Sequence, residues 1–196
     1  MKIGIINYGI AGNVYSIKKA VEKAGGTAFY INSCDDFNQA EKIIIPGVGS
    51  FRDAMNELKK NNFIEAIKNY EKPILGICLG MQILSTVGIE FGKTKGLDII
   101  DAEVRLLRTD AVIPHLGFNK INVLKSNKLL KGLEKEEFYF MHSYEVVNTK
   151  NIISKTHYMD YSFISSIQID NIYGVQFHPE KSREAGIRLL KNFIKL

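Results

Sequence analysis

The first half of the chain alternates short apolar runs with stretches of helical periodicity, and this alternation constrains the fold more than any other feature. Apolar runs of strand length lie at 2–7, 42–45 and 74–77. A strand that is apolar at nearly every position needs cover on both faces, as in a parallel sheet between helices. We therefore expect an α/β fold in which the functional residues follow the carboxyl ends of the parallel strands.

Caps and breakers locate the other elements of this half. Asn13 can cap a helix over 14–24, because apolar residues recur there with the helical period and Gly25 follows. The same reasoning predicts a strand at 27–31, one or two helices between 51 and 70, and a helix over 81–87. Strands and helices therefore alternate through this half.

The second half has a different pattern. Between 97 and 177 the apolar runs are short, often alternate with polar residues, and are separated by turn residues. We expect strands that extend the same sheet, followed by a last helix that Ser182 can cap. No Pro-rich or Ser-rich linker, repeat or low-complexity tract divides the halves, so residues 1–196 are expected to form one domain. The expected fold is a central, mostly parallel sheet flanked by helices, with a β-rich C-terminal half.

Composition and charge exclude several classes of function. The 196 residues are 45% hydrophobic, enough to bury a core, but no apolar run approaches the roughly 18 residues that cross a bilayer. The start of the chain lacks the apolar core and cleavage site of a signal peptide, so we expect a cytoplasmic protein without a membrane partner. The net charge of +5 comes from scattered lysines without an aromatic-interleaved basic motif, which indicates solvated helix faces rather than a nucleic-acid site.

The chain has two cysteines, Cys34 and Cys78, too few for a disulfide framework. Neither has another cysteine or a histidine at the spacing of metal ligands. We therefore expect no metal and no cofactor, and any role for Cys78 should be chemical.

The surroundings of Cys78 indicate what that chemistry is. In the stretch GICLG, Gly76 and Gly80 flank the cysteine where a strand gives way to a helix, which is typical of a nucleophile elbow. A helix start favours the thiolate, and the amide of Leu79 is left free to bind an oxyanion. The alternative is a buried core cysteine, and the turn alone does not decide between the two.

A thiolate nucleophile needs a base, and the stretch GVQFHPEKS offers one. His178 closes a strand that Pro179 prevents from continuing, and the carboxylate of Glu180 is placed to accept the imidazole N–H. The remaining histidines are interpreted as structural or substrate-contacting: His115, His142 and His157.

The stretch PGVGSF, residues 46–51, places two glycines after a strand. A dinucleotide-binding loop would need a third glycine three positions after Gly49, where Arg52 stands instead. A backbone donor for a tetrahedral oxyanion fits the loop better, because its strand is expected to neighbour the strand of Cys78.

Together these motifs identify a family. PGVGSF, GICLGMQIL and GVQFHPEKS, in this order and at these separations, resemble the class I (triad) glutamine amidotransferases, and the resemblance covers nearly the whole chain. Within that class, IPHLGFN at 113–119 and FYFMHSY at 138–144 look like the glutaminase subunits of imidazole glycerol phosphate synthases. The resemblance implies a flavodoxin-like α/β fold, in agreement with the pattern above.

The resemblance also implies roles for individual residues. Cys78 would attack the side-chain amide of glutamine, His178 would transfer the proton, and Glu180 would orient His178. The oxyanion hole would be formed by backbone amides of Gly47, Val48, Gly49 and Leu79. The glutamine pocket would be lined by Gln82, His142, Ser143 and Tyr144.

The ammonia released would pass to a partner, which in this family is a (β/α)8-barrel synthase subunit in a heterodimer. That subunit makes imidazole glycerol phosphate and aminoimidazole carboxamide ribonucleotide (AICAR) for histidine biosynthesis. Asn13, Phe118 and Lys181 match positions at the family's subunit interface, and an acidic face on the barrel would suit the basic charge of this chain.

Two departures from the family lie near that interface. YGIAGN at 8–13 has one residue more than the usual pattern, and GFN at 117–119 replaces Gly-Trp-Asn. An alternative is therefore a paralogous glutaminase that supplies ammonia to a partner amidating a polysaccharide or flagellar sugar. A binding module without glutaminase chemistry is a third possibility, which the presence of Cys78, His178 and Glu180 disfavours.

Overall fold

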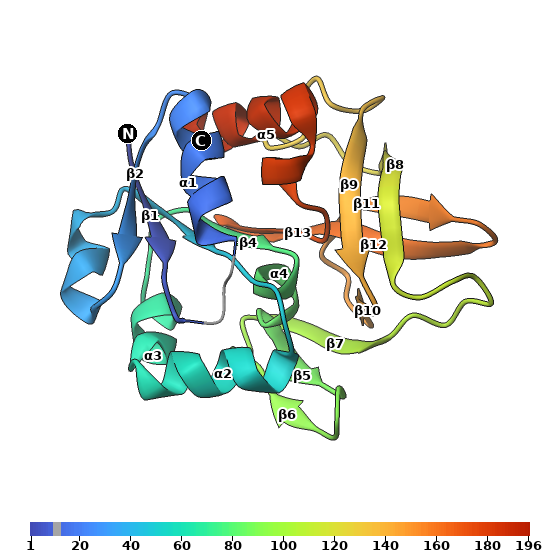
Figure 1. The fold of residues 1–196 in the computed structure, drawn as a ribbon, viewed down its shortest axis with the longest axis horizontal. Coiled ribbons are helices and arrows are strands. Elements are labelled where there is room, and N and C mark those ends of the chain that lie inside the picture. The colour runs from blue at the N-terminus through green and yellow to red at the C-terminus, as the bar shows by residue number, and fades with distance from the viewer. Residues whose placement is uncertain (10–12) are drawn as a thin grey trace.

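The computed structural model describes residues 1–9 and 13–196 (Figure 1). The extra residue expected between Tyr8 and Asn13 falls on 10–12, outside the described residues. The helices are α1 (Val14–Lys23), α2 (Phe51–Lys60), α3 (Phe63–Lys68), α4 (Leu79–Gln82) and α5 (Arg183–Lys195), with 3₁₀ turns η1 (Cys34–Gln39) and η2 (Pro179–Lys181).

Most strands belong to one mixed sheet. Within the described residues its order is β2 (Thr27–Ile31), β1 (Lys2–Ile6), β3 (Lys42–Ile45), β4 (Ile74–Ile77), β13 (Ile172–Val175), β12 (Tyr161–Ile169), β11 (Ile152–Tyr158), β8 (His115–Val123) and β9 (Glu137–His142). The strands from β2 to β13 are parallel, and those from β13 to β9 pair in antiparallel fashion. The expected α/β class with a β-rich C-terminal half is confirmed.

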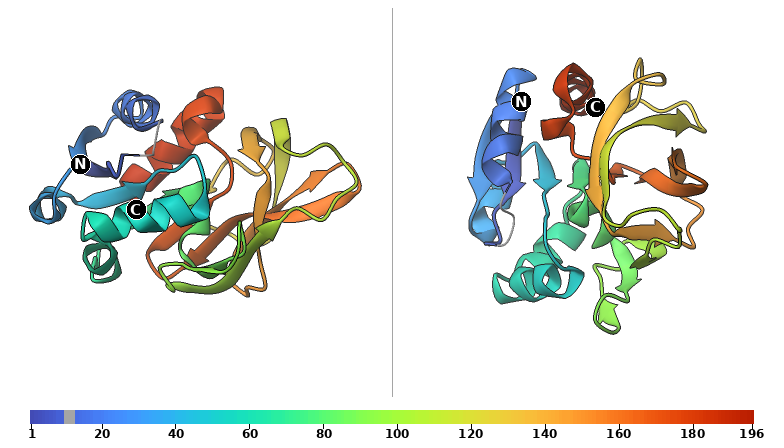
Figure 2. Two further views of the ribbon diagram at one scale, coloured as in Figure 1. Left: turned by 60° about the horizontal axis from the view of Figure 1, so that its bottom comes forward. Right: turned by 45° about the vertical axis from the view of Figure 1, so that its right-hand side comes forward.

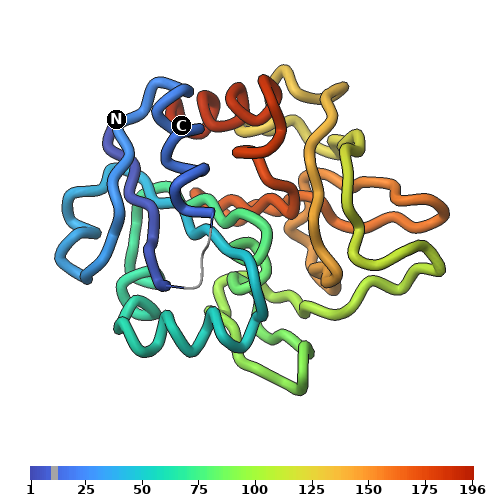
Figure 3. Tube along the Cα trace, viewed as in Figure 1, coloured from blue at the N-terminus to red at the C-terminus, as the bar shows by residue number. Residues whose placement is uncertain are grey.

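The parallel strands are apolar because each face is covered. Figure 2 gives two further views of the helices around these strands, and alternate residues of a strand join different cores. Ile44 packs in the core that includes residues of α1 and α5, whereas Ile43 and Ile45 pack in the core that includes residues of α2 and α3. Both ends of the chain lie on the same side of the molecule (Figure 3).

A second sheet departs from the expectation that all later strands extend the first one. Its order is β10 (Tyr144–Val147), β7 (Ile100–Leu106), β5 (Ser85–Gly88) and β6 (Thr94–Lys95). Val104 of β7 and Val146 of β10 are partners in this ladder, and both are buried in the core shared with α2 and α3. The small sheet thus packs into the same core as α2, α3 and one face of the large sheet.

The expected helix over 81–87 is wrong. Helix α4 ends at Gln82, and the chain from Ser85 enters β5. The β-branched Thr86 and Val87 favour a strand, and Val87 lies opposite Glu103 in the ladder with β7. Tertiary pairing therefore outweighs the helical spacing of the local sequence. Among the described residues, no helix has the length and apolar character needed to cross a bilayer.

Candidate active site

The sheet brings the cysteine and histidine segments together. Strands β4 and β13 are parallel neighbours with Ile77 opposite Val175, and the amide of Cys78 donates to the carbonyl of Val175 over 2.7 Å. Cys78 follows β4, and His178 follows β13 by three residues. Both therefore leave the same edge of the sheet, as the parallel pattern predicts.

Cys78 lies on the sharp turn that its glycine neighbours suggested. Its backbone angles are φ 53° and ψ −110°, a conformation that side chains rarely adopt. A Cβ at Gly76 would lie 2.6 Å from the carbonyl oxygen of Gly80, and one at Gly80 would lie 1.9 Å from that of Ile45. The turn therefore requires both glycines. The helix that follows has four residues, so its dipole is weaker than that of the longer helix expected.

The glycine loop after β3 packs against this turn. A Cβ at Gly47 would lie 2.7 Å from Cβ of Leu79, and Val48 and Gly49 line the same cavity as Cys78. The hydroxyl of Tyr8 donates to the carbonyl of Pro46 over 2.6 Å and holds the loop. Burial, and then the charge of Cys78, raise the pKa of Tyr8, which keeps its hydroxyl a neutral donor.

His178 and Glu180 form a buried pair. Nδ1 of His178 lies 2.8 Å from Oε1 of Glu180, and both side chains are fully buried. The same Oε1 accepts a hydrogen bond of 2.8 Å from Nδ2 of Asn13. The hydroxyl of Ser182 donates to the carbonyl of His178 over 2.6 Å and accepts from the amide of Tyr139 over 2.9 Å. Asn13 and Ser182 thus hold the His178 segment, and neither caps its own helix through its side chain.

The other imidazole nitrogen of His178 is available for proton transfer. Nε2 is buried and has no hydrogen-bond partner among the residues that the structure describes. Burial lowers the pKa of His178, but the negative charges of Cys78 and Glu180 outweigh burial and raise it to about 10. These surroundings therefore favour the imidazolium form of His178.

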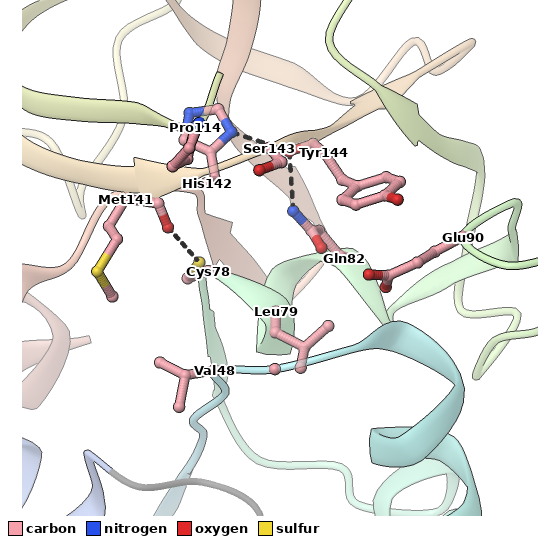
Figure 4. A pocket seen from close by; sticks show the side chains of 11 residues that line it. Val48, Cys78, Leu79, Gln82, Glu90, Pro114, Met141, His142, Ser143 and Tyr144 are labelled. Carbon is pink, nitrogen blue, oxygen red and sulfur yellow. Dashed lines mark hydrogen bonds between the residues drawn. The ribbon is translucent and has the colours of Figure 1, made fainter. Parts of the chain in front are cut away.

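Two further groups contact the sulfur of Cys78. The carbonyl oxygen of Met141 lies 3.8 Å from Sγ and can accept from a thiol, and Nε2 of Gln176 lies 3.5 Å away and donates to Sγ. The sulfur opens on a cavity of about 220 Å³ (Figure 4). The cavity is lined by Val48, Gly49, Cys78, Leu79, Gln82, Glu90, Pro114, Met141, His142, Ser143 and Tyr144.

The predicted pocket residues all line this cavity, with distinct hydrogen bonds. Nε2 of Gln82 donates to the carbonyl of Tyr144 over 3.0 Å, toward the side of the cavity where Ser143 and Tyr144 lie (Figure 4). Nδ1 of His142 lies 2.8 Å from the same carbonyl, and its Nε2 lies 3.2 Å from Nδ1 of His115. Burial lowers the pKa of His142 to about 3, so this wall of the cavity is neutral near pH 7.

The predicted interface residues are placed in two ways. Asn13 is buried against Glu180. Lys181 is exposed, with its ammonium 5.7 Å from the ring centre of Tyr139, and Phe118 packs against Tyr139 and against the guanidinium of Arg183, which lies 4.4 Å from its ring centre. The assignment of these residues to an interface remains a prediction.

Sequence reasoning missed Glu90, Gln176 and Met141. Glu90 lines the cavity, and its Oε2 accepts from the amide of Phe51 over 2.7 Å. Its local sequence carries no recognisable signal. Gln176 stands two positions before His178 on the same edge, so the strand period could have drawn attention to it. Within the described ranges, no group of three or more His, Cys, Asp or Glu side chains is arranged to hold a metal ion.

Comparison with known families and proteins agrees with this geometry. The family model described as glutamine amidotransferase class-I matches residues 5–196. Imidazole glycerol phosphate synthase subunit HisH 1 of Campylobacter jejuni (strain RM1221) is 43% identical, covering 99% of this chain and 100% of that protein. Subunit HisH 2 of Methanococcus maripaludis is 46% identical, covering 98% of each chain. Subunit HisH of Aquifex aeolicus is 41% identical over 98% of this chain and 96% of its own.

Solved structures share the fold at lower identity. A putative GMP synthase component from Thermoplasma acidophilum superposes with a TM-score of 0.76 and 19% identity over 100% of this chain and 92% of its own. The PurLQS structure from Thermotoga maritima gives a TM-score of 0.74 and 16% identity over 99% of this chain and 97% of its own. At these identities the likeness concerns the fold.

Proposed function

This chain belongs to the class-I glutamine amidotransferase family, and we propose that it is the glutaminase subunit of an imidazole glycerol phosphate synthase. The observation that carries the proposal is the placement of Cys78 and of the buried His178–Glu180 pair after two adjacent parallel strands, at the same edge of the sheet. The similarity to HisH subunits along nearly the whole chain supports the choice of subunit. We also propose that residues 1–196 act as one domain.

The reaction begins at Cys78. Its thiolate attacks the side-chain carbonyl carbon of glutamine, and the carbonyl oxygen becomes an oxyanion. We assign the oxyanion hole to the amide of Leu79 and an amide of the 47–49 loop, each worth about 3 kcal/mol in the transition state. His178 gives its proton to the leaving nitrogen as the C–N bond breaks. The products of this step are ammonia and a glutamyl thioester on Cys78.

Hydrolysis of the thioester completes the cycle. His178, now neutral, takes a proton from water as the water oxygen attacks the thioester carbon. The C–S bond breaks, glutamate leaves, and the thiolate and imidazolium are restored. Glu180 holds Nδ1 of His178 through both steps, so Nε2 remains the atom that carries the proton.

The cavity suits the rest of the substrate. Glutamine carries an α-ammonium group, and the carboxylate of Glu90 on the cavity wall is the acidic group suited to bind it. We assign the remaining contacts to Gln82, His142 and the Ser143–Tyr144 segment, as the resemblance implies. Because His142 is neutral, the charged groups at the site are Glu90 and the His178–Glu180 pair.

Ammonia released into water would be protonated and lost as a nucleophile, so a partner must receive it directly. We propose a (β/α)8-barrel synthase that makes imidazole glycerol phosphate and AICAR. Lys181 and Phe118 lie on the surface beside the His178 segment and are proposed to contact that partner, with Asn13 at its edge.

The experiment compares two nitrogen sources in the complex of this chain with the barrel synthase. With Cys78→Ala, glutamine-dependent synthesis should fall by several orders of magnitude, whereas synthesis from added ammonia should persist, because only the thioester step is lost. Loss of both activities would contradict a dedicated glutaminase role. Co-purification from the native source tests the partner: a barrel synthase supports the proposal, and a sugar-modifying amidotransferase would support the paralogous alternative.

A further inference from the structure

We propose that Gln176 is a further catalytic residue, whose side-chain amide donates a hydrogen bond to the Cys78 sulfur and stabilises its thiolate, with Gln82 holding that amide in the donating orientation. The inference rests on the proposed glutaminase function and adds a group to it. Neither the triad nor the oxyanion hole includes Gln176.

The contact is direct and shielded from water. Nε2 of Gln176 lies 3.5 Å from Sγ of Cys78, a normal distance for a hydrogen bond to sulfur, and the Gln176 side chain is completely buried. Its backbone is fixed as well, because its amide donates to the carbonyl of Ser165 over 2.9 Å. The donor is therefore in place before the reaction and needs no reorganisation.

The orientation of the Gln176 amide follows from its neighbour. A backbone carbonyl can only accept, so Gln82 must present its NH₂ group to the carbonyl of Tyr144, 3.0 Å away. The same Nε2 lies 3.0 Å from Oε1 of Gln176 and donates to it. Because the oxygen end of Gln176 is occupied in this way, its NH₂ end faces the sulfur. Reversing Gln176 would place two donors together at Gln82 and an oxygen against the thiolate.

The balance of donors and acceptors decides which form of the sulfur is favoured. A thiol can donate to the carbonyl of Met141, 3.8 Å away, but a thiolate cannot. A thiolate needs donors, and Gln176 supplies one in addition to the charge of His178. A hydrogen bond to a charged group is roughly twice as strong as a neutral one. Gln176 should therefore stabilise the attacking thiolate, and again the thiolate that leaves when the thioester is hydrolysed.

The test measures the reactivity of the thiol without glutamine. The full chain carrying Cys34→Ser leaves Cys78 as the single thiol, and the rate of its alkylation by iodoacetamide is followed against pH. With Gln176→Met, which keeps the length but removes the donor, the midpoint of the profile should rise by about one pH unit, and the rate at a fixed pH below both midpoints should fall about tenfold. Gln82→Met should shift the midpoint in the same direction by less, and the double variant no further than Gln176→Met alone.

Two outcomes would overturn the inference. An unchanged alkylation profile in a folded Gln176→Met chain would show that Gln176 only fills space. If Gln176→Met does not fold, as judged by circular dichroism, Gln82→Met decides, because it leaves Gln176 in place. An unshifted alkylation profile for Gln82→Met would contradict the proposed chain of hydrogen bonds from Gln82 through Gln176 to Cys78. The proposed function is tested separately: if the unaltered complex did not hydrolyse glutamine, that proposal would fail whatever the alkylation profiles show.

Discussion

Cys78 is a strained residue whose position depends on glycines before and after it. Its positive φ costs on the order of 1–3 kcal/mol in a residue with a side chain, and the close approach of the backbone at Gly76 and Gly80 over-determines that conformation. The strain places Sγ at the cavity, between the carbonyl of Met141 and the amide of Gln176. The backbone strain, the burial and the hydrogen bonds of this residue therefore all fix the position of Sγ.

The protonation state of His178 gives the first prediction. Its pKa is raised from 6.5 to about 10, so the ring should stay an imidazolium through pH 9. Because the folded-state pKa lies above the unfolded one, the stabilisation from this pairing is complete below about pH 6.5 and is lost as the pH rises through about 10. Nuclear magnetic resonance titration of the imidazole nitrogens measures the midpoint directly.

Cys78→Ala is the informative variant for this titration. Removing the sulfur removes a charge that raises the pKa of His178, while burial, which lowers it, remains. We expect the midpoint to move down toward neutrality, with Glu180 alone opposing burial. An unchanged midpoint for His178 would show that Cys78 does not interact with it.

At the scale of elements, two helices begin at polar residues that serve the site. Asn13 precedes α1 and bonds to Glu180, and Ser182 precedes α5 and bonds to the backbone of His178 and Tyr139. A helix start usually uses such a side chain to cap its own amides. Here the side chains connect the helix starts to the segment that carries His178, so helix packing and triad geometry are coupled.

Asn13→Ala should therefore reduce both stability and catalysis. It removes a donor from the buried carboxylate of Glu180, which should cost about 1.5–3 kcal/mol in the free energy of unfolding. Glutamine turnover in the complex should fall mainly through kcat, because Glu180 orients His178 and does not line the cavity. Asn7→Ala is the matched control, since Asn7 bonds to Asn32 in an exposed position. Equal losses in denaturant unfolding for the two variants would contradict the role of Asn13.

The sequence predicts elements well where local spacing and tertiary pairing agree. The strands β3 and β4 begin and end at their predicted bounds, because their continuous apolar runs are buried on both faces. The segment 81–87 fails because Val87 pairs with Glu103, a contact between distant segments that no local pattern contains. The division of the later strands into two sheets has the same cause.

Some features of the candidate site could likewise be predicted from the local sequence, and others could not. The turn at Cys78 and the pairing of His178 with Glu180 follow from motifs a few residues long, and the structure brings these groups to one edge. The hydrogen bonds from Gln82 to Tyr144 and to Gln176 join three separate segments of the chain. Only the folded arrangement reveals which group each amide contacts.

At the scale of the whole molecule, the proposed partner surface and the site share one turn. Lys181 directly follows Glu180 within η2, and its exposed ammonium lies above the ring of Tyr139. The amide of His178 in turn donates to the carbonyl of Tyr139 over 2.8 Å. A partner that contacts Lys181 would therefore affect the position of the segment that holds His178. Binding of the partner could in this way change the rate of catalysis.

Lys181→Ala tests this coupling through the complex. The net charge of +5 suits an acidic face on the partner, and loss of one exposed charge should raise the Kd for the barrel synthase by about two- to fivefold at low salt and less at high salt. Glutamine turnover at saturating partner should also be lower, because the contact beside Glu180 is missing. Lys150→Ala, an exposed lysine on a different loop, is the control and should change neither quantity. A Kd and a turnover rate that match the unaltered chain would place the partner on another face.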